Sequence, residues 1–575
     1  MSFYDAIRVG ASGAADTAFT VDRSLRFNDN DSAYLQRTPS SASNRRTFTF
    51  SFWVKRANLG MYTHIFGMQY SSSANQFVIR FDNDDRLTVF DFQTSLGGMQ
   101  MRKTSDAFFR DVSAWYHIVA AIDTTQSTGS NRNRIYVNNV ELTSFDNENT
   151  PSQNHDTVVN TTNTHYIGQK NSSNYFDGYL AEFHFIDGQQ LTPSSFGETD
   201  ATTGQWIPKD TSGLTYGTNG YRLQFADNSG TTATTLGKDT SGNSNNFTPN
   251  NFSVSAGTGN DSLEDTPTNN FATLNSLKKP TNGALSNGNL DGSGNASSWV
   301  SFFSTIYVSS GKWFCEVKVN ATRVGVGIGK NVVNGADENS YLGSAADTYA
   351  YFDLNGKWNN NSNSSYGATY TTNDIIGMAL DMDAGTLIFY KNGVSQGTAF
   401  TGLSGEFALG FSVYGGSASA SINYGQRAFD YTVPTGYKAL NSANLPNPSI
   451  PFPNKHFDTL LYTGNDGSQS ITGLNFQPDW AWIKERSGAY HHSLTDSVRG
   501  VLKTLSSSRV DIAEYSESSG LNQFLSNGLG FNGRGYFFVN RDTQTYAAWN
   551  WNAGNTDSAT YRVVVVSDSG NKYRF

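Results

Sequence analysis

The chain contains a single cysteine, Cys315, among its 575 residues. One cysteine cannot form an internal disulfide, which excludes a secreted domain stabilised by disulfide bonds. In the stretch KWFCEVKV, the alternation of apolar and polar residues places Cys315 on one face of a strand. We expect its side chain to act as a small buried hydrophobe, because free cysteine usually behaves that way.

Positive charge is sparse, and long apolar runs are missing. Charged residues make up only 15% of the chain, the net charge is −9, and lysine and arginine are scattered singly. Without a basic stripe to follow a phosphate backbone, nucleic acid is not expected as a partner. No apolar run approaches the roughly 18 residues that span a bilayer, and Asp5 and Arg8 stand where a signal peptide needs apolar residues. We therefore expect no membrane insertion, and synthesis in a cytoplasm.

Aromatic residues and glycine are abundant instead. Aromatics reach 14% and glycine contributes 55 residues, a composition that suits twisted sheets joined by tight turns. Period-two alternation recurs along the chain, as in RTFTFSFWVKR at 46–56, and indicates antiparallel strands. One helix is predicted, in SLTDSVRGVLKTLSSS, where Val498, Leu502 and Leu505 follow a helical spacing after a capping Thr495 or Asp496. The sequence thus predicts an all-β protein with one short helix.

Two polar stretches are candidates for metal sites. Asp82-Asn83-Asp84-Asp85 joins the strands NQFVIRF and RLTVFDF, and these residue types favour a hairpin turn because they tolerate left-handed backbone. The Asp-x-Asp spacing is compatible with calcium, but turn chemistry is the favoured interpretation. His491 and His492 are adjacent, and consecutive strand residues point to opposite faces, so they form a poor metal pair. No metal and no cofactor are expected.

Proline and glycine-rich stretches divide the chain into modules. Five of the 13 prolines fall between Pro434 and Pro453, and the segment NLPNPSIPFPN cannot form a central strand because proline lacks a ladder donor. Residues 208–298 are rich in Gly, Ser, Thr and Asn and show little periodicity. The expected divisions are an attachment segment at 1–21, a first module at 22–207, a connector at 208–298, a second module at 299–441, a linker at 442–455 and a third module at 456–575.

The first module contains four characteristic stretches in order: SLRFNDNDSAYLQRT, FTFSFWVKR, WYHIVAAIDTTQ followed by RIYVNNVEL, and HYIGQKNSSNYFDGYLAEFHFIDGQQLTPSSF. Together they resemble the laminin-G or concanavalin-type jelly roll of lectins and pentraxins. The resemblance covers nearly the whole module. It implies an antiparallel β-sandwich without identifying a ligand.

The second module contains the most specific motifs, namely GKWFCEVKV, VGVGIG, YFDLNGKW and NDIIGMALDMDAGTLIFYKNGVSQGTAF, followed by INYGQRAFDYTVPTGYKALN. Asp381 and Asp383 flank a tight turn, and Asn392-Gly393 is a two-residue hairpin signal. The set resembles a SPRY domain, which implies a sandwich that binds partners through its loops and lacks enzymatic residues. The two resemblances together imply tandem antiparallel β-sandwiches, a jelly roll and then a SPRY-like sandwich, followed by a mostly-β C-terminal domain.

The third module contains FDTLLYTGNDGSQSITGLNFQPDWAWIKERSG, HSLTDSVRG, LSNGLGF and YAAWNWNAG. These stretches resemble a C-terminal domain of uncharacterised tail and fibre proteins from marine bacteriophages. The opening stretches AIRVGASGAAD and RSLRFND also resemble the start of such proteins, which implies that residues 1–21 attach the protein to a virion. The tryptophans of this module stand at every second position in two stretches, as Trp480 and Trp482 and as Trp549 and Trp551. Alternate strand residues share a face, so one face of these strands is expected to be core.

Candidate catalytic groups are few. Concanavalin-like folds host glycosidases as well as lectins, and a glycosidase needs two carboxylates facing one cleft. No E-x-D-x-x-E motif occurs in the chain. The nearest candidates are Glu182 with His184 on one predicted strand, and Glu514 with Glu517 in a polar stretch. We expect no catalytic residues.

Three aromatic residues of the second module are the candidate ligand-binding residues. Sugar sites commonly stack rings on exposed aromatics bordered by a few polar groups. Trp358 and Tyr366 border the loop WNNNSNSSYG, and Tyr414 lies in VYGGS. The alternative is that each ring packs back on its own sandwich.

The favoured function is a non-enzymatic bacteriophage virion surface protein, a tail or capsid fibre, that recognises a glycan or another receptor on the host surface. Other virion proteins would bind its N-terminal segment, and it would reside on the virion surface. Several copies raise a weak affinity, so a homo-oligomer is expected, with a trimer favoured. Two alternatives remain open: a structural decoration or connector subunit that binds other virion proteins, and a polysaccharide depolymerase that depends on Glu182.

Overall fold

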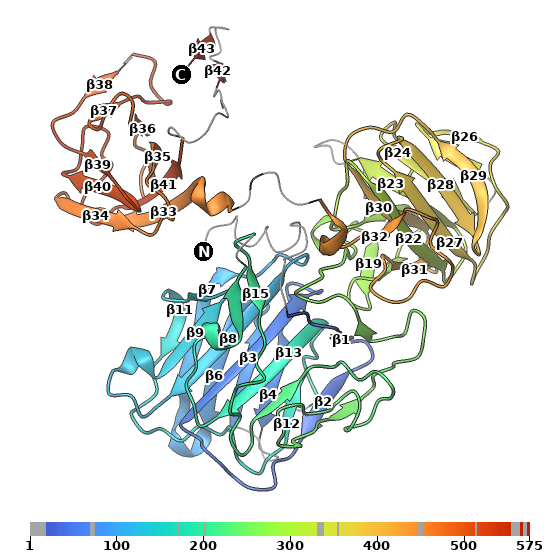
Figure 1. Ribbon diagram of the computed structural model, residues 1–575, viewed down its shortest axis with the longest axis horizontal. Coiled ribbons are helices and arrows are strands. Elements are labelled where there is room, and N and C mark those ends of the chain that lie inside the picture. The colour runs from blue at the N-terminus through green and yellow to red at the C-terminus, as the bar shows by residue number, and fades with distance from the viewer. Residues whose placement is uncertain are drawn as a thin grey trace. The chain divides into compact units, whose positions relative to one another are not determined.

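Nearly all regular structure in the described part of the chain is β-strand (Figure 1). The computed structural model describes residues 19–69, 75–170, 172–200, 203–330, 338–353, 356–446, 450, 452–511, 514–553, 564–566 and 572–574. Helical structure within these ranges is limited to three-residue 3-10 turns, η2 (Thr94–Leu96), η3 (Gly129–Asn131), η4 (Pro193–Ser195), η5 (Ser276–Lys278), η6 (Ser442–Asn444) and η7 (Pro453–Lys455). None of the helices found there has the length and apolar character that a bilayer crossing requires. The all-β prediction is confirmed.

The first sandwich packs two antiparallel sheets around a phenylalanine-rich core. One sheet has the order β10-β9-β8-β3-β13-β1-β18, with β16 also paired to β13. Its strands are β10 (Val140–Glu141), β9 (Asn133–Val137), β8 (Trp115–Asp123), β3 (Thr47–Arg56), β13 (Gly178–Asp187), β1 (Ser24–Phe27), β18 (Ser262–Leu263) and β16 (Tyr221–Leu223). On β3, Phe48, Phe50 and Phe52 enter the core at every second position, as the alternation predicts.

The second sheet of this sandwich has the order β11-β7-β6-β5-β4-β12-β2-β17, and a separate ribbon pairs β14 with β15. The strands are β11 (Phe145–Asn149), β7 (Gly98–Phe108), β6 (Arg86–Gln93), β5 (Gln76–Phe81), β4 (Thr63–Gln69), β12 (His165–Ile167), β2 (Tyr34–Arg37), β17 (Thr248–Asn250), β14 (Gly197–Thr199) and β15 (Trp206–Pro208). The predicted hairpin joins β5 to β6, and Asp85 at its end has a positive φ of 72°.

The connector is built into its neighbours. Its strands β16, β17 and β18 extend the sheets of the first sandwich, whereas β19 (Gly283–Ser286) and β20 (Asp291–Gly294) join the second. Between these strands the connector covers the outer side of β3 and β8, where Leu263 and Leu290 pack with Trp53 and Trp115. Both faces of β3 are therefore buried.

Buried ion pairs fix the connector to the first sandwich. The Lys55 ammonium donates to the Asp265 carboxylate, to Asn270 Oδ1 and to the Phe271 carbonyl oxygen, each at 2.8 Å. The side chains of Lys55 and Asp265 are both 0% exposed. Burial lowers the pKa of Lys55 and raises the pKa of Asp265, because removal from water penalises both charges. The mutual attraction and the surrounding hydrogen bonds oppose this penalty.

The second sandwich also consists of two antiparallel sheets. One has the order β19-β20-β31-β22-β27-β28-β29, with β32 paired to β22, and the other has the order β21-β30-β23-β24-β25-β26. The further strands are β31 (Ser419–Asn423), β22 (Lys312–Val319), β27 (Ile375–Asp381), β28 (Thr386–Lys391), β29 (Val394–Phe400), β32 (Lys438–Ala439), β21 (Trp299–Phe303), β30 (Phe407–Tyr414), β23 (Val324–Lys330), β24 (Thr348–Phe352), β25 (Gly356–Asn359) and β26 (Ser362–Ser364). Cys315 is buried on β22, as expected, and burial raises the pKa of its thiol.

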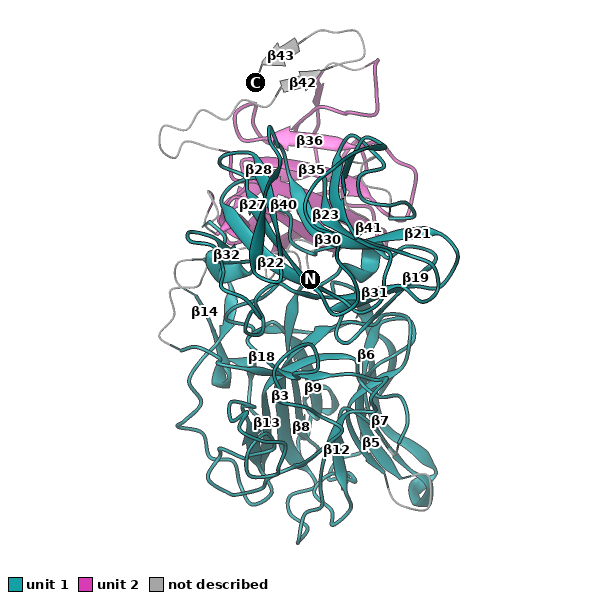
Figure 2. Cartoon of the chain, turned by 90° about the vertical axis from the view of Figure 1, so that its right-hand side faces the viewer, with its two compact units in different colours: residues 1, 3–448 teal, residues 2, 449–575 magenta. Residues whose placement is uncertain are grey.

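A separate compact unit begins at residue 449, inside the proline-rich segment (Figure 2). It contains the sheets β33-β41-β35-β36 and β34-β40-β39 and the pairs β37-β38 and β42-β43. The strands are β33 (Phe457–Thr463), β41 (Thr545–Trp551), β35 (Trp480–Glu485), β36 (Ser493–Asp496), β34 (Ser468–Thr472), β40 (Gly528–Asn532), β39 (Leu521–Leu525), β37 (Lys503–Thr504), β38 (Tyr515–Ser516), β42 (Val564–Val566) and β43 (Lys572–Arg574).

The predicted helix in this unit is wrong. Residues 493–496 form β36, which pairs with β35, and the chain then turns back, so that Leu505 bridges to Leu494. Asp496 caps the turn by accepting the Arg499 N–H at 2.8 Å, and Gly500 takes a positive φ of 97°. Val498 is 94% exposed. The apolar spacing is that of a hairpin, in which pairing with β35 supplies the backbone hydrogen bonds that a helix would otherwise form.

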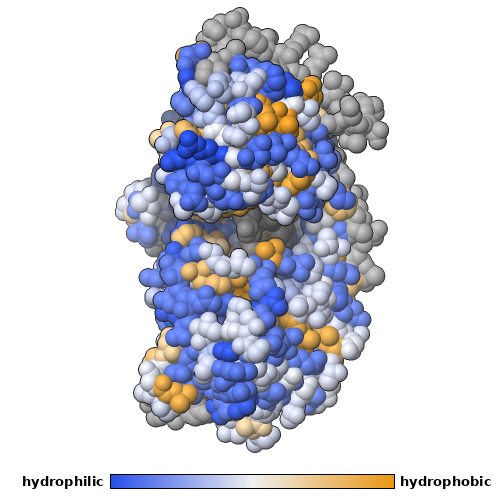
Figure 3. Space-filling view, turned by 90° about the vertical axis from the view of Figure 1, so that its left-hand side faces the viewer, coloured by the Kyte–Doolittle hydropathy of each residue, from blue (hydrophilic) through white to orange (hydrophobic). Residues whose placement is uncertain are grey.

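In the face shown in Figure 3, hydrophobic residues form small patches separated by hydrophilic ones. Scattered apolar residues of this kind are normal for a folded protein, since polar groups cannot cover the whole surface. Sites are therefore better sought where large side chains line a cavity or gather on one face.

Substitution of Asp265 tests the buried ion pair. Asp265→Ala leaves the Lys55 ammonium buried without its counter-charge, which is expected to lower the free energy of unfolding by about 3–5 kcal/mol. Urea unfolding of the full chain measures this loss. The control is Asp156→Ala, which removes a partner of Arg46 at the surface, and should leave the unfolding curve unchanged because water screens exposed pairs. Equal effects of the two substitutions would contradict the assignment.

Candidate functional site

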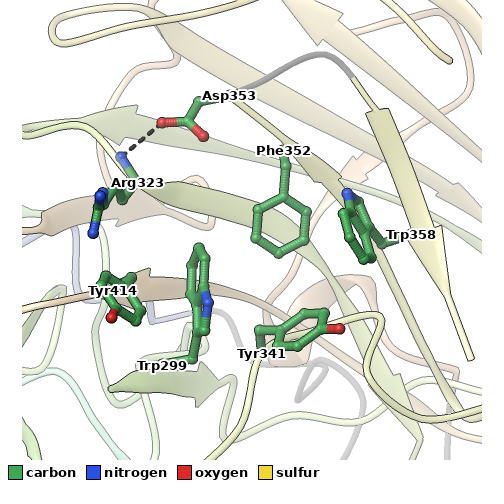
Figure 4. A pocket seen from close by; sticks show the side chains of 7 residues that line it. All are labelled: Trp299, Arg323, Tyr341, Phe352, Asp353, Trp358 and Tyr414. Atoms are coloured by element: carbon green, nitrogen blue, oxygen red, sulfur yellow. Dashed lines mark hydrogen bonds between the residues drawn. The ribbon is translucent and has the colours of Figure 1, made fainter. Parts of the chain in front are cut away.

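An aromatic cleft lies on the outer face of the six-stranded sheet of the second sandwich (Figure 4). Its volume is about 450 Å³, which falls within the usual range for ligand sites of about 300–1,000 Å³. Seven side chains line it: Trp299, Arg323, Tyr341, Phe352, Asp353, Trp358 and Tyr414.

Strand pairing brings these side chains together from distant parts of the chain. Trp299 at the start of β21 pairs with Tyr414 at the end of β30, and the backbone of Tyr414 in turn donates to the Arg323 carbonyl oxygen at 3.1 Å, just before β23. Phe352 ends β24, and Trp358 lies on the adjacent β25. The cleft is thus a cross-strand row at one end of the sheet.

Gly325, in the alternating stretch VGVGIG, makes room for this row. Val324, Val326 and Ile328 of β23 point into the sandwich core, so the intervening residues face the cleft side of the sheet. A Cβ at Gly325 would lie 2.4 Å from the Phe352 ring. Any larger residue at Gly325 would therefore displace the ring from the cleft.

Edge-to-face contacts hold the rings in place. The Trp299 and Phe352 centroids lie 5.2 Å apart at 89°, and those of Tyr341 and Trp358 lie 5.7 Å apart at 89°. The Trp299 and Tyr414 centroids are 5.3 Å apart. Aromatic pairs favour this geometry because the positive ring edge meets the negative face. All of these rings except Phe352 remain half-buried and leave surface accessible in the cleft.

One end of the cleft is charged. Asp353, which is buried, accepts the backbone N–H of Arg323 at 2.6 Å (Figure 4). Arg323 has a positive φ of 66°, a conformation that is uncommon for a residue with a side chain. Its exposed guanidinium lies 4.8 Å from the centroid of the Tyr414 ring. The cleft therefore combines apolar ring surfaces with a cationic hydrogen-bond donor at one end.

Two of the three predicted binding residues, Trp358 and Tyr414, line this cleft, and Tyr366 does not. Tyr366 packs edge-on against Tyr351 and Phe389, and its hydroxyl donates to the Gly397 carbonyl oxygen at 2.6 Å. Burial raises the pKa of Tyr366 to about 12. Its role in the structure is therefore to close the sandwich core.

Sequence reasoning missed the other lining residues. Trp299 and Tyr341 lie in segments that carry no strand motif of their own, and Phe352 lies inside the quoted motif YFDLNGKW without any sign of which face it occupies. Asp353 follows Phe352 in the same motif, and Arg323 directly precedes VGVGIG, but neither motif indicates that these polar side chains border a cleft. The alternation in VGVGIG was the available clue, because a strand face without side chains leaves space for rings from its neighbours.

Glu182 and His184 do lie together, but both are buried beneath residues that cover one side of β13. Glu182 is 3% exposed, accepts from Arg222 at 2.9 Å and lies 3.3 Å from His184 Nε2. It has a positive φ of 45° at an irregularity in the β3–β13 pairing. His184 Nδ1 is 2.9 Å from the Tyr216 hydroxyl. The pair belongs to a buried hydrogen-bonded network and not to a cleft.

The remaining polar candidates have structural partners. Glu514 forms ion pairs with Arg499 and Lys503, and Glu517 accepts the Tyr536 N–H. His492 Nδ1 accepts from the Trp482 indole at 2.7 Å.

The aspartates of the β5–β6 hairpin also have protein partners. Asp82 accepts from Arg80 and Thr88, and Asp85 from Arg56 and Arg110. No group of three or more potential metal-ligating side chains gathers within the part of the chain that the structure describes.

Three segments of the chain match known families. Residues 28–195 match the concanavalin A-like lectin/glucanases superfamily, residues 312–427 match the SPRY domain, and residues 452–571 match a domain of unknown function, DUF7483. The resemblances of the first two modules are thereby confirmed. These lectin-like and SPRY domains indicate a role in binding or recognition.

Individual proteins match the chain over a small part of its length. E3 ubiquitin-protein ligase RKP of Arabidopsis thaliana is 30% identical over 139 residues, which make up 23% of this chain and 11% of that protein. Protein ssh4 of Botryotinia fuckeliana (strain B05.10) is 28% identical over 131 residues, 22% of this chain and 24% of that protein. The crystal structure of the SPRY domain of human HERC1 is 20% identical and covers 25% of this chain and 95% of its own, with a TM-score of 0.22. The matched segment thus spans a quarter or less of the two curated relatives.

The acid dependence of stability tests the structural role of Glu182. Burial alone would raise its pKa, but the hydrogen bonds and charges of His184 and Arg222 outweigh that effect and hold the pKa below its ordinary 4.5. Such a group stabilises the folded state above about pH 4.5 and loses that contribution as the pH falls through the folded-state pKa.

Glu182→Gln is therefore expected to lower the urea midpoint at pH 7. As the pH falls below 4.5, the midpoint of this variant should decrease less than that of the wild type. The control is Glu198→Gln, at an exposed position on β14, which should retain the wild-type profile. An unchanged midpoint for Glu182→Gln at pH 7 would argue against a structural role.

Proposed function

We propose that the protein is a non-enzymatic bacteriophage virion surface protein, a tail or capsid fibre, that recognises a glycan or another receptor on the host surface through the aromatic cleft. The observation that carries the proposal is the arrangement of Trp299, Tyr341, Trp358 and Tyr414 around one cavity with Arg323 at its end. Large aromatic surfaces bordered by a few polar groups are typical of sites that bind small molecules or sugars.

The chemistry of the cleft suits a saccharide. The apolar face of a pyranose ring packs against an indole or phenol ring, while its hydroxyl groups need hydrogen-bond partners at the edge. The Arg323 guanidinium supplies several donors in a fixed plane. The hydrogen bond from the Arg323 N–H to Asp353 fixes the backbone from which this side chain extends, and the guanidinium lies over the Tyr414 ring at the end of the cleft.

The virion assignment rests on the resemblance of the two ends of the chain to phage proteins. Residues 1–18 of the attachment segment lie outside the described residues. On this proposal residues 1–21 bind other virion proteins, and the protein assembles as a homo-oligomer, with a trimer favoured. Several clefts on one particle would then give strong overall attachment even though each individual contact is weak. The protein would act on the virion surface after synthesis in the host cytoplasm.

Trp358→Ala tests the cleft. Loss of the indole is expected to weaken glycan binding by the full chain at least tenfold, about 1.4 kcal/mol. A glycan array finds the ligand, and titration calorimetry of the purified chain then measures the affinity. Tyr366→Phe is the matched control, because it alters a nearby aromatic residue outside the cleft and should retain wild-type affinity.

Three results would redirect the proposal. If the full chain binds no glycan at high density, the connector subunit becomes the better interpretation. If Trp358→Ala binds like the wild type, the cleft is not the site. Release of reducing ends from host surface polysaccharide, lost in Glu182→Gln while that variant remains folded, would favour the depolymerase.

Deletion of residues 1–20 tests the attachment segment. The shortened protein should fold but be absent from purified virions, because its contact with the particle is removed. Immunoblotting of gradient-purified particles measures incorporation. Equal incorporation of the deleted and full-length proteins would refute this part of the proposal.

A further inference from the structure

One sheet of the C-terminal unit carries tryptophans on the side that faces away from its core. In the sheet β33-β41-β35-β36, the core side holds Ala481 and Ile483 of β35 and Tyr546 and Ala548 of β41. The tryptophans alternate with these residues and are half-buried: Trp480, Trp482, Trp549 and Trp551. We call these four residues the tryptophan platform.

The platform consists of two rows that run across the strands. Trp480 pairs with Trp551, and their rings stack with centroids 4.3 Å apart at 25°. Phe457 of β33 extends this row, with its ring 4.8 Å from that of Trp551. In the second row Trp482 pairs with Trp549, at 6.0 Å and 62°. Both rows place aromatic side chains next to one another across neighbouring strands.

The core does not require these rings. The opposite face of the sheet already closes the unit against β34, β39 and β40, through residues such as Leu529 and Phe531. The outer face of such an antiparallel sheet is ordinarily polar because it meets water. Here it also carries Leu461, which is 60% exposed. A cluster of large apolar side chains on an outer face marks an interaction surface.

The area of this outer sheet face indicates what kind of partner it can bind. Four strands about 4.8 Å apart and about six residues long, at roughly 3.3 Å per residue, span a projected area of about 400 Å². A stable interface between folded proteins needs about 800 Å² from each partner. The face is therefore too small for a second copy or a globular partner, and it fits one extended chain.

The surrounding residues favour a carbohydrate as that chain. Lys484 follows Trp482 on the same face of β35, Asp496 of β36 pairs with Trp480, and Thr459 of β33 pairs with Trp549. These polar groups border the rings, so hydroxyl groups of a sugar would find hydrogen-bond partners where its apolar C–H groups contact the exposed aromatic surface. The net charge of −9 disfavours a nucleic-acid strand, whose bases would also stack.

We propose that the tryptophan platform binds a polysaccharide chain that lies across its two rows of rings. This is a second saccharide site, in a different compact unit from the cleft, and it does not depend on the function proposed for the cleft. It gives the domain of unknown function a binding role. Sugar units of one polysaccharide that contact successive rows would each contribute to the binding free energy.

Affinity electrophoresis of the full chain tests the platform. The probes are laminarin, hydroxyethyl cellulose, galactomannan and alginate, each cast into a native gel. Every protein carries Trp358→Ala, so that the cleft does not contribute. We expect at least one polysaccharide to retard this protein, and the added double substitution Trp480→Ala with Trp549→Ala to weaken the retardation at least tenfold. The added substitution Val510→Ala is the control, because Val510 is exposed in the same unit and should leave retardation unchanged.

A second measurement does not rely on disruptive variants. The C-terminal unit contains no tryptophans besides the platform, so 5-fluorotryptophan labelling and single Trp→Phe substitutions assign four ¹⁹F signals to it. The retarding polysaccharide should shift these signals and spare those of Trp53 and Trp115, which are fully buried in the first sandwich.

Four outcomes would overturn the proposal. These are no retardation by any of the probes, retardation that survives the double substitution, platform signals that stay fixed when the polysaccharide is added, and an oligomer that the double substitution converts to monomers in sedimentation. The last outcome would make the face an interface between copies.

Discussion

The buried contact between Lys55 and Asp265 is the constraint on which the larger unit depends. It holds the connector against the outer side of β3, where Asn270 and the Phe271 carbonyl complete the shell of the ammonium. From there the chain enters β19 and β20 of the second sandwich. A charge removed from water is tolerated only when its partners are fixed, so this contact, together with the pairing of β16, β17 and β18, ties the path of the connector to the first sandwich.

Both proposed sites lie on outer faces of sheets, for the same physical reason. A strand that buries every second residue leaves the intervening residues free of packing constraints. In β23 these intervening positions are glycines, and Gly325 leaves the space that the Phe352 ring occupies. In β35 and β41 they are tryptophans, which fill the space themselves. The first arrangement forms a cleft suited to a short ligand and the second a flat face suited to an extended one.

The sequence indicated local features well where one residue type decides the conformation. The Asp82–Asp85 hairpin and the burial of Cys315 follow from turn chemistry and alternation, and both are present in the structure. The helix at Val498 and Leu502 failed because a short apolar spacing fits either a helix or a hairpin, and pairing with β35 decided between them. Trp358 and Tyr366 looked equivalent beside one polar loop, yet only Trp358 reaches the cleft.

By itself the sequence determined the all-β class, because period, turn residues and composition are local properties, and its motifs carried the resemblance to the two sandwich families. The tertiary structure decided which aromatics meet. Trp299, Phe352 and Tyr414 are brought together by the pairing of β21, β30, β23 and β24, and the tryptophan platform by the pairing of β35 with β41. Strand register between distant segments sets these contacts, and a single sequence carries no local record of it.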